Sequence, residues 1–376
     1  MDLNRFAVDL LWLRVGKNGG SETFIRNILD GMCETDRDFN GVLLVSRDNA
    51  DSFEHYKTDA RFSIYECPVD SENIGKRLLW QNLHLADTVK KLGIKKCFEP
   101  VYSVPFIKTG GIEFYTVIHD IQAKHFPDYF SWMRRVYMDM SWKNAIHKSK
   151  WIVSISNYAM ADIEKEYPAS SAKLTMIYNP ISVKKIDDHR AKEIISEYGV
   201  LPNEFFLCVS SLLPHKNLEV LIHMMARRAD DMKLVIVGVG GALENKFNEL
   251  IEQYGLKGKV KLIAYIEDEK RDALYSTCRA FLFPSVFEGF GMPPVEAMLM
   301  DKPVITTKCT SIPEVTRNEA FYVDDPESID EWIETTDLVI NDLGKSQVFE
   351  KTISSRSNPY SRKKVADKYL DLLLLK

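Results

Sequence analysis

The sequence predicts an α/β protein made of two Rossmann-like domains in tandem. Short β-like runs alternate with helical stretches along almost the whole chain, which is typical of parallel α/β units. The chain has 376 residues, which is long for one ordinary core and comfortable for two. A charged stretch at Val183–Glu193 and a break at Leu201–Asn203 interrupt the alternation, so we expect the domains to be joined near residues 183–203.

The expected strands of the first half are Phe6–Trp12, Gly41–Ser46, Phe62–Glu66, Phe114–His119, Trp151–Ser154 and Leu174–Tyr178. Those of the second half are Phe205–Val209, Lys233–Val237, Val260–Ile263, Ala280–Phe283 and Val304–Thr306. The expected helices are Glu22–Met32, Lys76–Leu92, Trp132–His147, Tyr158–Glu166, Leu218–Arg228, Leu243–Tyr254, Asp268–Thr277 and Pro294–Leu299. These elements predict an N-terminal domain over residues 1–185 and a C-terminal domain over residues 200–355. A last helical segment, residues 360–376, is expected to cross back to the first domain.

Composition excludes several classes of protein. Hydrophobic residues make up 45% and charged residues 27% of the chain, as in soluble globular proteins. The formal net charge of −5 does not favour wholesale binding of nucleic acid. The six cysteines are scattered, without a C-x-x-C pair or a Cys/His cluster, so neither a zinc site nor a disulfide framework is indicated. Without a signal-peptide pattern or a long apolar run, we expect a cytoplasmic protein that at most lies on a membrane surface.

The strongest chemical signal lies between Phe281 and Met300. An apolar strand there leads into the loop Glu288–Gly291, and a helix is expected to start near Pro293. Glycines let a backbone approach a ligand closely, and the free amides of a helix N-terminus attract phosphate. The carboxyl end of a parallel strand is also where open α/β sheets bind ligands.

Two carboxylates flank this turn. Glu288 lies on the expected loop and Glu296 lies about one turn into the expected helix, so both can point into one cleft. A carboxylate repels phosphate but accepts hydrogen bonds from sugar or ribose hydroxyls. The alternative interpretation is that both are favourable charges near the first turn of a helix.

A second signal is the segment Ser210–Leu218, which also follows a strand and opens a helix. Ser211 and Lys216 are candidate nucleotide-binding residues in it, with Asn217 as the expected N-cap. Lys216 would place a positive charge on the oxygens of a leaving diphosphate. The alternative is an exposed lysine beside a helix cap.

These segments carry a family resemblance. The strings VSSLLPHKNLEVLI, AYIEDEKRDALYSTCRAFLFPSVFEGFGMPPVEAM and KPVITTKCTSIPEV resemble glycosyltransferase family 4, the group 1 transferases. They match that family's phosphate-clamp strand, its E-x-x-x-x-x-x-x-E donor motif and the P-V-I segment that follows. The resemblance covers residues 205–325. It continues more loosely through Gly19–Glu22 and the string VIHDIQAKHFPDYF.

The resemblance implies a retaining transferase with a nucleotide-diphosphate sugar donor and a GT-B fold, in which two Rossmann-like domains face each other across a cleft. It assigns ribose hydroxyls to Glu296, the leaving diphosphate to Lys216, and the transferred sugar with the diphosphate to Glu288. The backbone amides that it places beside Glu288 are those of Gly289, Phe290 and Gly291. Family members often have arginine at the position of His215, and a neutral histidine is a weaker clamp.

Three residues of the N-terminal half join this predicted site through the resemblance. Gly19 and Gly20 resemble the loop that closes over donor phosphate and acceptor, although an ordinary strand-to-helix turn would look the same. His119 ends a predicted strand where a family histidine approaches the donor sugar, and Asp120 could simply orient it. The alternative for His119 is a structural histidine.

No cofactor is expected beyond the donor substrate. No D-x-D motif stands at a strand end, so we expect metal-independent catalysis without a covalent nucleophile. The turn Gly238–Gly241 does not match the dinucleotide fingerprint, which disfavours a nicotinamide dehydrogenase. A sugar-nucleotide epimerase, a phosphorylase of similar shape and a non-enzymatic sugar-nucleotide sensor remain alternatives.

The expected function is hexose transfer to a glycan or lipid-linked acceptor, as in bacterial surface polysaccharide assembly. GDP-mannose is the first expectation for the donor, with UDP-glucose, UDP-galactose and dTDP-rhamnose open. Residues 131–151 combine basic and aromatic side chains, which suits an anionic membrane surface. The interpretation that the pattern favours is an amphipathic helix packed on the sheet, with its cations extended to water.

Overall fold

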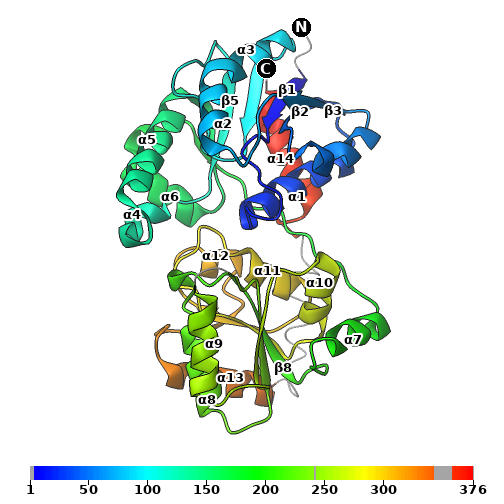
Figure 1. Ribbon diagram of the computed structural model, residues 1–376, viewed down its shortest axis with the longest axis vertical. Coiled ribbons are helices and arrows are strands. Elements are labelled where there is room, and N and C mark those ends of the chain that lie inside the picture. Colours follow the sequence, from blue (N-terminus) through cyan, green and yellow to red (C-terminus); the bar gives the residue numbers. More distant parts are fainter. Residues whose placement is uncertain (1–3, 241–242, 343–357, 376) are drawn as a thin grey trace. The chain divides into compact units, whose positions relative to one another are not determined.

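The computed structural model describes residues 4–240, 243–342 and 358–375 (Figure 1). The chain divides into two compact units, one of Met1–Ile181 with Pro359–Lys376 and one of Ser182–Asn358. Each unit holds one parallel sheet with helices on its faces (Figure 1). The prediction of two Rossmann-like α/β domains is therefore confirmed.

The first unit contains a seven-stranded parallel sheet in the order β3-β2-β1-β4-β5-β6-β7. Its strands are β1 (Arg5–Asp9), β2 (Asn40–Ser46), β3 (Phe62–Cys67), β4 (Lys96–Glu99), β5 (Glu113–Ile118), β6 (Ser149–Ser154) and β7 (Leu174–Met176). The strand order reverses between β1 and β4, and the loops that follow these two strands diverge there. Such a switch point is where open α/β sheets bind ligands.

The α-helices of this unit are α1 (Gly20–Glu34), α2 (Ile74–Trp80), α3 (Ala86–Lys91), α4 (Gln122–His125), α5 (Trp132–Lys148), α6 (Asn157–Glu166) and α14 (Arg362–Leu374). Short 3-10 turns lie at Ala50–Thr58, Pro127–Tyr129 and Pro168–Ser170. One π-helical turn, Gln81–Leu85, joins α2 to α3. The single predicted helix Lys76–Leu92 is therefore three helical pieces in the structure.

The second unit contains a six-stranded parallel sheet in the order β10-β9-β8-β11-β12-β13. Its strands are β8 (Phe205–Val209), β9 (Lys233–Val237), β10 (Val260–Ile263), β11 (Ala280–Phe283), β12 (Val304–Thr307) and β13 (Phe321–Val323). Its helices are α7 (Asp188–Ser196), α8 (Glu219–Arg227), α9 (Glu244–Gln253), α10 (Asp268–Thr277), α11 (Met292–Leu299), α12 (Ile312–Val315) and α13 (Ile329–Asp342). Here the strand order reverses between β8 and β11.

The elements β13, α12 and α13 were not predicted from the sequence, and two further features differ from the prediction. The polar stretch expected to be a linker contains α7, which belongs to the second unit; Asp187 caps it, and the side chain of Asp187 accepts the amide of His189. The second feature is β4, which the sequence did not indicate. Its residues Lys-Cys-Phe-Glu carry a charge at each end, yet all four are buried, so its pattern does not look like that of a buried strand.

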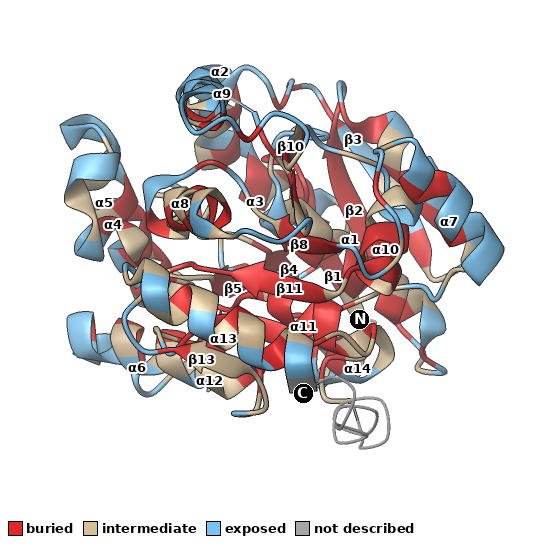
Figure 2. Ribbon diagram, turned by 90° about the horizontal axis from the view of Figure 1, so that it is seen from below, coloured by how far each residue is buried: buried red, intermediate tan, exposed pale blue. Residues whose placement is uncertain are grey.

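The cores follow the sheets, as the buried strands in Figure 2 show. In the second unit, apolar side chains of β8, β9 and β11 pack against those of α8 and α13. In the first unit, α14 packs against α1, and the Lys96 ammonium on β4 donates to the carbonyl of Leu373 at 2.7 Å. The C-terminal helix is thus bound to the sheet and to the first helix of the unit.

Packing of α14 on α1 depends on Gly31. A Cβ there would lie 2.3 Å from the carbonyl oxygen of Arg362, far inside van der Waals contact. We expect Gly31→Ala to destabilise the protein by about 1–3 kcal/mol, because α14 must shift. Thermal unfolding measures this. Gly75→Ala in α2 is the matched control, because nothing lies within 4 Å of its added methyl. A melting temperature for Gly31→Ala at or above that of Gly75→Ala would contradict this account of the packing.

Candidate functional site

In the second unit, the loops after β8 and β11 meet at the switch point of the sheet. Lys216 ends the short helical turn Pro214–Lys216, and Glu288 lies in the loop between β11 and α11. The Lys216 Nζ lies 2.7 Å from the Glu288 Oε1, and their side chains are only 17% and 11% exposed. The structure therefore brings together two residues that the sequence predicted as site residues from separate motifs.

The backbone of both loops is fixed around this ion pair. The carbonyl of His215 accepts the amide of Val286 at 2.9 Å and the hydroxyl of Ser285 at 3.2 Å. On the other side, the Ser311 hydroxyl donates to the carbonyls of Glu288 and Phe290 at 2.9 and 2.8 Å. These hydrogen bonds connect the loop after β8, the loop after β11 and the start of α12 around Lys216 and Glu288.

Gly291 completes the turn into α11. Its φ of 91° lies in the left-handed region, and a Cβ there would lie 2.6 Å from the Ile312 Cδ1. Only glycine fits this position without strain. The helix after it begins at Met292, with prolines in its first turn, close to the predicted start. Gly289 and Phe290 are buried beside Glu288.

Glu296 lies in the middle of α11 and is 5% exposed. One of its carboxylate oxygens accepts the hydroxyl of Tyr275 at 2.9 Å. Burial raises the pKa of Glu296, while the positive charge of Arg271 and the Tyr275 hydrogen bond oppose that rise. Both of these neighbours belong to α10, so α10 fixes the orientation of the Glu296 carboxylate. Sequence reasoning did not identify either of them, because only packing of α10 on α11 brings them there.

The predicted role of Asn217 is corrected, and the structure gives His215, whose role was left open, a defined place. Asn217 is not the N-cap of α8: Leu218 holds that position, and Asn217 has a left-handed backbone (φ 51°) with its side-chain amide donating to the carbonyl of Pro326. His215 cannot act as a charged clamp, because burial lowers the pKa of its imidazole to about 3. Its contribution here is the backbone carbonyl that links the two loops. Ser211 is exposed just after β8.

The first unit has a pocket of about 420 Å³ at its own switch point. The loops after β1, β4 and β5 form it together with α2 and α5. Its lining residues are Trp12, Arg14, Asn18, Ser21, Ile74, Arg77, Leu78, Gln81, Val101, Tyr102, Ser103, His119, Asp120, Arg134, Tyr137 and Met138. Two of the predicted residues, His119 and Asp120, are among them. Gly19 and Gly20 lie between the lining residues Asn18 and Ser21, where Gly19 (φ 49°) is the N-cap of α1.

His119 is neutral and held by the backbone. Its Nε2 lies 2.9 Å from the carbonyl oxygen of Pro100, so this nitrogen carries the proton. Burial lowers the pKa of His119. The Asp120 carboxylate accepts the amide of Gln122 at 2.9 Å, and its negative charge partly opposes the lowering of the His119 pKa.

Beneath the pocket lies a group of buried carboxyls that sequence reasoning missed. Asp9 at the end of β1 and Glu99 at the end of β4 are both fully buried and hydrogen-bonded to each other. Desolvation and the charge of Asp9 raise the pKa of Glu99 well above its usual value, so Glu99 is the protonated partner. The Asp9 carboxylate accepts the side-chain amide of Gln81 at 2.6 Å through one oxygen and the backbone amide of Leu11 at 2.9 Å through the other. In the sequence, this group would be indicated by a carboxylate at the end of each of two neighbouring strands. It was missed because β4 was not predicted.

Metal binding finds no support in the described part of the chain. No group of three or more His, Cys, Asp or Glu side chains there is placed to hold a metal ion.

All six cysteines are free thiols. No helix among the described residues has the length and apolar composition needed to cross a bilayer.

The sequence is similar to known glycosyltransferases. Residues 192–356 match the family described as glycosyl transferases group 1. The O-antigen chain mannosyltransferase RfbU of Salmonella typhimurium is 30% identical over 231 residues, 61% of each chain. The O-antigen chain mannosyltransferase B of Escherichia coli is 27% identical over 221 residues, 57% of this chain and 58% of that protein. The matched region thus spans about three fifths of the length of these relatives.

Solved structures share the fold over nearly the whole chain. A glycosyltransferase from Rickettsia africae has a TM-score of 0.73 at 17% identity and covers 99% of this chain and 98% of its own. Anabaena HepE, crystallised with UDP and glucose, has a TM-score of 0.67 at 17% identity and covers 98% of this chain and 95% of its own. At such identity the likeness concerns the fold.

The buried Glu99 gives a prediction about stability and pH. Because its folded-state pKa is raised, the folded protein keeps a proton that the unfolded chain releases above the usual carboxyl pKa, so stability falls as pH rises. The isosteric variant Glu99→Gln still offers Asp9 a hydrogen-bond donor, the amide N–H of glutamine, but it has no carboxyl proton to lose. We expect the unfolding free energy of the wild type to fall with pH, relative to the variant, by up to ~1.4 kcal/mol per pH unit. Urea unfolding from about pH 5 to 9 measures it, and parallel curves for the two proteins would refute the assignment.

Proposed function

We propose that this chain, which matches the group 1 glycosyltransferases over residues 192–356 and has the GT-B pair of Rossmann-like domains, transfers a hexose from a nucleotide-diphosphate sugar to a glycan acceptor. The observation that carries the proposal is the Lys216–Glu288 ion pair at the switch point of the second unit. It lies within the segment that matches the family. Surface polysaccharide biosynthesis is the proposed setting, supported by the two O-antigen mannosyltransferases.

The pair suits a donor that carries both sugar hydroxyls and a diphosphate. Lys216 supplies a positive charge that stabilises the diphosphate as negative charge develops on it. Glu288 accepts hydrogen bonds from sugar hydroxyls. The backbone amides of Gly289 to Gly291, in the same loop, are proposed to donate to the sugar and the diphosphate. In the free protein each residue compensates the charge of the other, so both are held in position before the donor arrives.

Glu296 is proposed to bind the ribose hydroxyls of the donor. Tyr275 engages one of its oxygens, which leaves the carboxylate oriented for a second bond. His119 in the first unit is proposed to contact the sugar as a neutral hydrogen-bonding group, since burial lowers its pKa. Gly19 and Gly20 at the start of α1 are proposed to approach the donor phosphate.

The chemistry proposed is a retaining displacement without a metal ion or a protein nucleophile. The bond from the sugar to the diphosphate breaks, and the acceptor hydroxyl attacks from the same face. The departing phosphate oxygen takes the proton of that hydroxyl. GDP-mannose is the proposed donor, supported by the mannosyltransferase names of the two relatives. An epimerase of the same architecture differs by turning over the donor without an acceptor.

A mutational series separates the two charged roles. We expect Lys216→Ala to slow transfer, because the leaving diphosphate loses its cation. The loss of transition-state stabilisation should be about 2–4 kcal/mol. Glu296→Ala is expected to raise the dissociation constant for the nucleotide more than it slows transfer. Lys257→Ala is the matched control, because this lysine of the same unit is 73% exposed and pairs with Glu252 on the surface. Rates and affinities of both variants equal to those of the Lys257→Ala control would overturn the assignment.

A thermal-shift panel identifies the donor. GDP-mannose, UDP-glucose, UDP-galactose and dTDP-rhamnose are compared at equal concentration, and binding to the folded state raises the melting temperature. At about 100 times the dissociation constant the gain is ~2.7 kcal/mol of stability. We expect the largest shift with GDP-mannose. A larger shift with another of the four would reassign the donor, and no shift with any of them would contradict nucleotide-sugar binding.

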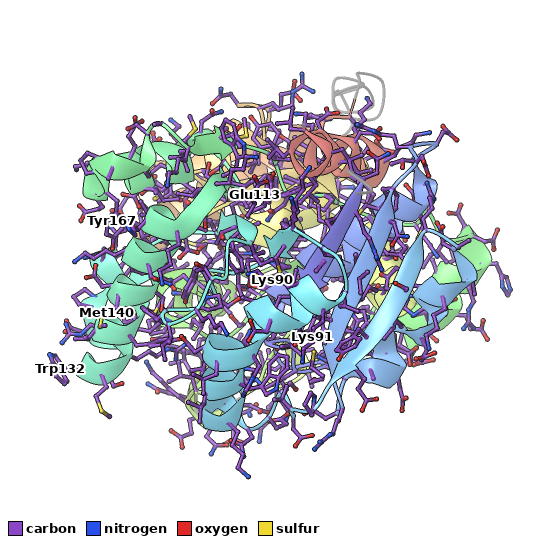
Figure 3. All side chains as sticks on the ribbon, turned by 90° about the horizontal axis from the view of Figure 1, so that it is seen from above. Lys90, Lys91, Glu113, Trp132, Met140 and Tyr167 are labelled. Carbon is purple, nitrogen blue, oxygen red and sulfur yellow. The ribbon has the colours of Figure 1, made fainter. Side chains whose placement is uncertain are left out.

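Peripheral membrane contact is the remaining part of the proposal. Trp132, Met133 and Met140 on α5 are 68%, 73% and 53% exposed, and Figure 3 shows Trp132 and Met140 at the outer edge of this helix. The second half of α5 is different. There Trp142 is buried, and the Lys148 ammonium donates to backbone carbonyls within the unit. We therefore propose that the first half of α5 lies on an anionic lipid surface.

Liposome sedimentation tests this contact. We expect Trp132→Glu to reduce binding to vesicles containing anionic phospholipid by at least about tenfold, because it replaces an inserted ring by a repelled charge. Leu338→Glu is the control: it is an exposed apolar residue, 52% accessible, on α13 of the other unit. Equal sedimentation of the two variants, or no sedimentation of the wild type, would exclude this surface.

A further inference from the structure

The floor of the first unit's pocket carries two buried polar groups that face no protein partner in the described parts of the chain. Arg77 is 9% exposed and Gln81 is 1% exposed, and both line the pocket. The Nε of Arg77 and the Oε1 of Gln81 have no hydrogen-bond partner. A buried donor or acceptor without a partner is unfavourable, so a ligand that bonds to these two atoms in the pocket would gain free energy.

Local structure places the two groups side by side. Arg77 and Gln81 are four residues apart, so they share one face of the helix. Gln81 opens the π-helical turn, a rare conformation that is frequent at functional sites. Its amide nitrogen is fixed by the 2.6 Å hydrogen bond to Asp9, which turns the Oε1 away from that carboxylate. The pocket floor thus presents one cationic donor and one neutral acceptor.

The charge of the lining is positive. Arg14, Arg77 and Arg134 line the pocket, and Asp120 is the one acidic residue among its lining residues. None of the three arginines forms an ion pair with a carboxylate within the described ranges, and the one hydrogen bond of the Arg77 guanidinium, to the carbonyl of Leu11, is 3.5 Å long. Burial lowers the pKa of Arg77, and the nearby charge of Asp9 only partly opposes this. A guanidinium so placed is complementary to an anion.

The walls of the pocket fit a sugar ring. Trp12, Tyr102 and Tyr137 line it, and aromatic side chains are common in pockets that bind small organic ligands. Its volume of about 420 Å³ lies within the usual range for such sites, ~300–1,000 Å³. The hydroxyls of Ser21 and Ser103, also in the lining, add neutral hydrogen-bonding groups.

We propose that this pocket binds an acidic saccharide: a sugar hydroxyl donates to the Oε1 of Gln81, and an anionic oxygen of the same molecule accepts from Arg77 and Arg14. If the chain is the proposed transferase, this saccharide is its acceptor, a step that rests on the proposed function. The anion is a phosphate or a carboxylate on the sugar. Recognition needs both groups, because the floor offers a cation and an acceptor together.

Binding to the full chain tests the proposal by calorimetry. The probes are mannose, mannose 6-phosphate, glucuronic acid and inorganic phosphate. We expect mannose 6-phosphate or glucuronic acid to bind at least about tenfold more tightly than mannose and than inorganic phosphate. The better of the two acidic sugars identifies the anion as phosphate or carboxylate. Mannose or inorganic phosphate binding as tightly as both acidic sugars would overturn the proposal.

Two variants link binding to these residues. We expect Arg77→Met to abolish the preference for the acidic sugar without lowering the melting temperature of the ligand-free protein, because it removes a buried cation that has no ion-pair partner among the described residues. A purely structural arginine would instead destabilise the fold when replaced. Arg14→Gln changes a partly exposed side chain and is expected to weaken the preference while folding normally. Arg47→Gln, an exposed arginine outside the pocket lining, is the matched control.

The outcome is separable from that of the proposed function. Binding of nucleotide-sugars to the second unit should be the same in Arg77→Met as in the wild type. Acidic-sugar binding that depends on Arg77 supports the pocket even if no nucleotide-sugar binds. An acidic-sugar preference that persists in both Arg77→Met and Arg14→Gln refutes the pocket even if transfer is observed.

Discussion

The ion pair between Lys216 and Glu288 is the interaction on which the second unit's site depends. Both side chains are largely withdrawn from water, and a buried charge without its partner is costly. The two residues are 72 positions apart, and they meet because β8 and β11 are neighbours at the switch point of the sheet. The hydrogen bonds of the His215 carbonyl and the Ser311 hydroxyl then hold the two loops at this separation.

The two units place charge at their switch points in different ways. In the second unit a cation and a carboxylate compensate each other. In the first unit the carboxyls of Asp9 and the protonated Glu99 are buried together, and Arg77 lacks an ion-pair partner in the described chain. One switch point is therefore electrically balanced before a ligand binds, whereas the other retains an excess of positive charge in its lining. This difference fits sites for two chemically different ligands.

Much of the fold could be predicted because apolar periodicity is a local property. In the second unit β8, β9, β10 and β11 have the predicted bounds, since each is a short, mainly apolar run. Prediction failed where tertiary contacts supply what the local pattern lacks. β4 begins with a lysine that donates to the carbonyls of α14 and ends with a glutamate that burial protonates. Asn217 looked like a helix cap, but its side chain is used by the distant carbonyl of Pro326.

The sequence by itself determined the two α/β units, the motif around Glu288 and Glu296, and the resemblance to the group 1 glycosyltransferases. It did so because spacing, glycine and proline positions are readable along the chain. Only the tertiary structure decided that Lys216 pairs with Glu288, that the His215 carbonyl links the two loops and that Arg77 and Gln81 face a pocket. The reason is that charge compensation, desolvation and hydrogen-bond partners depend on which strands become neighbours. Sheet topology sets those neighbours, and residue spacing does not record it.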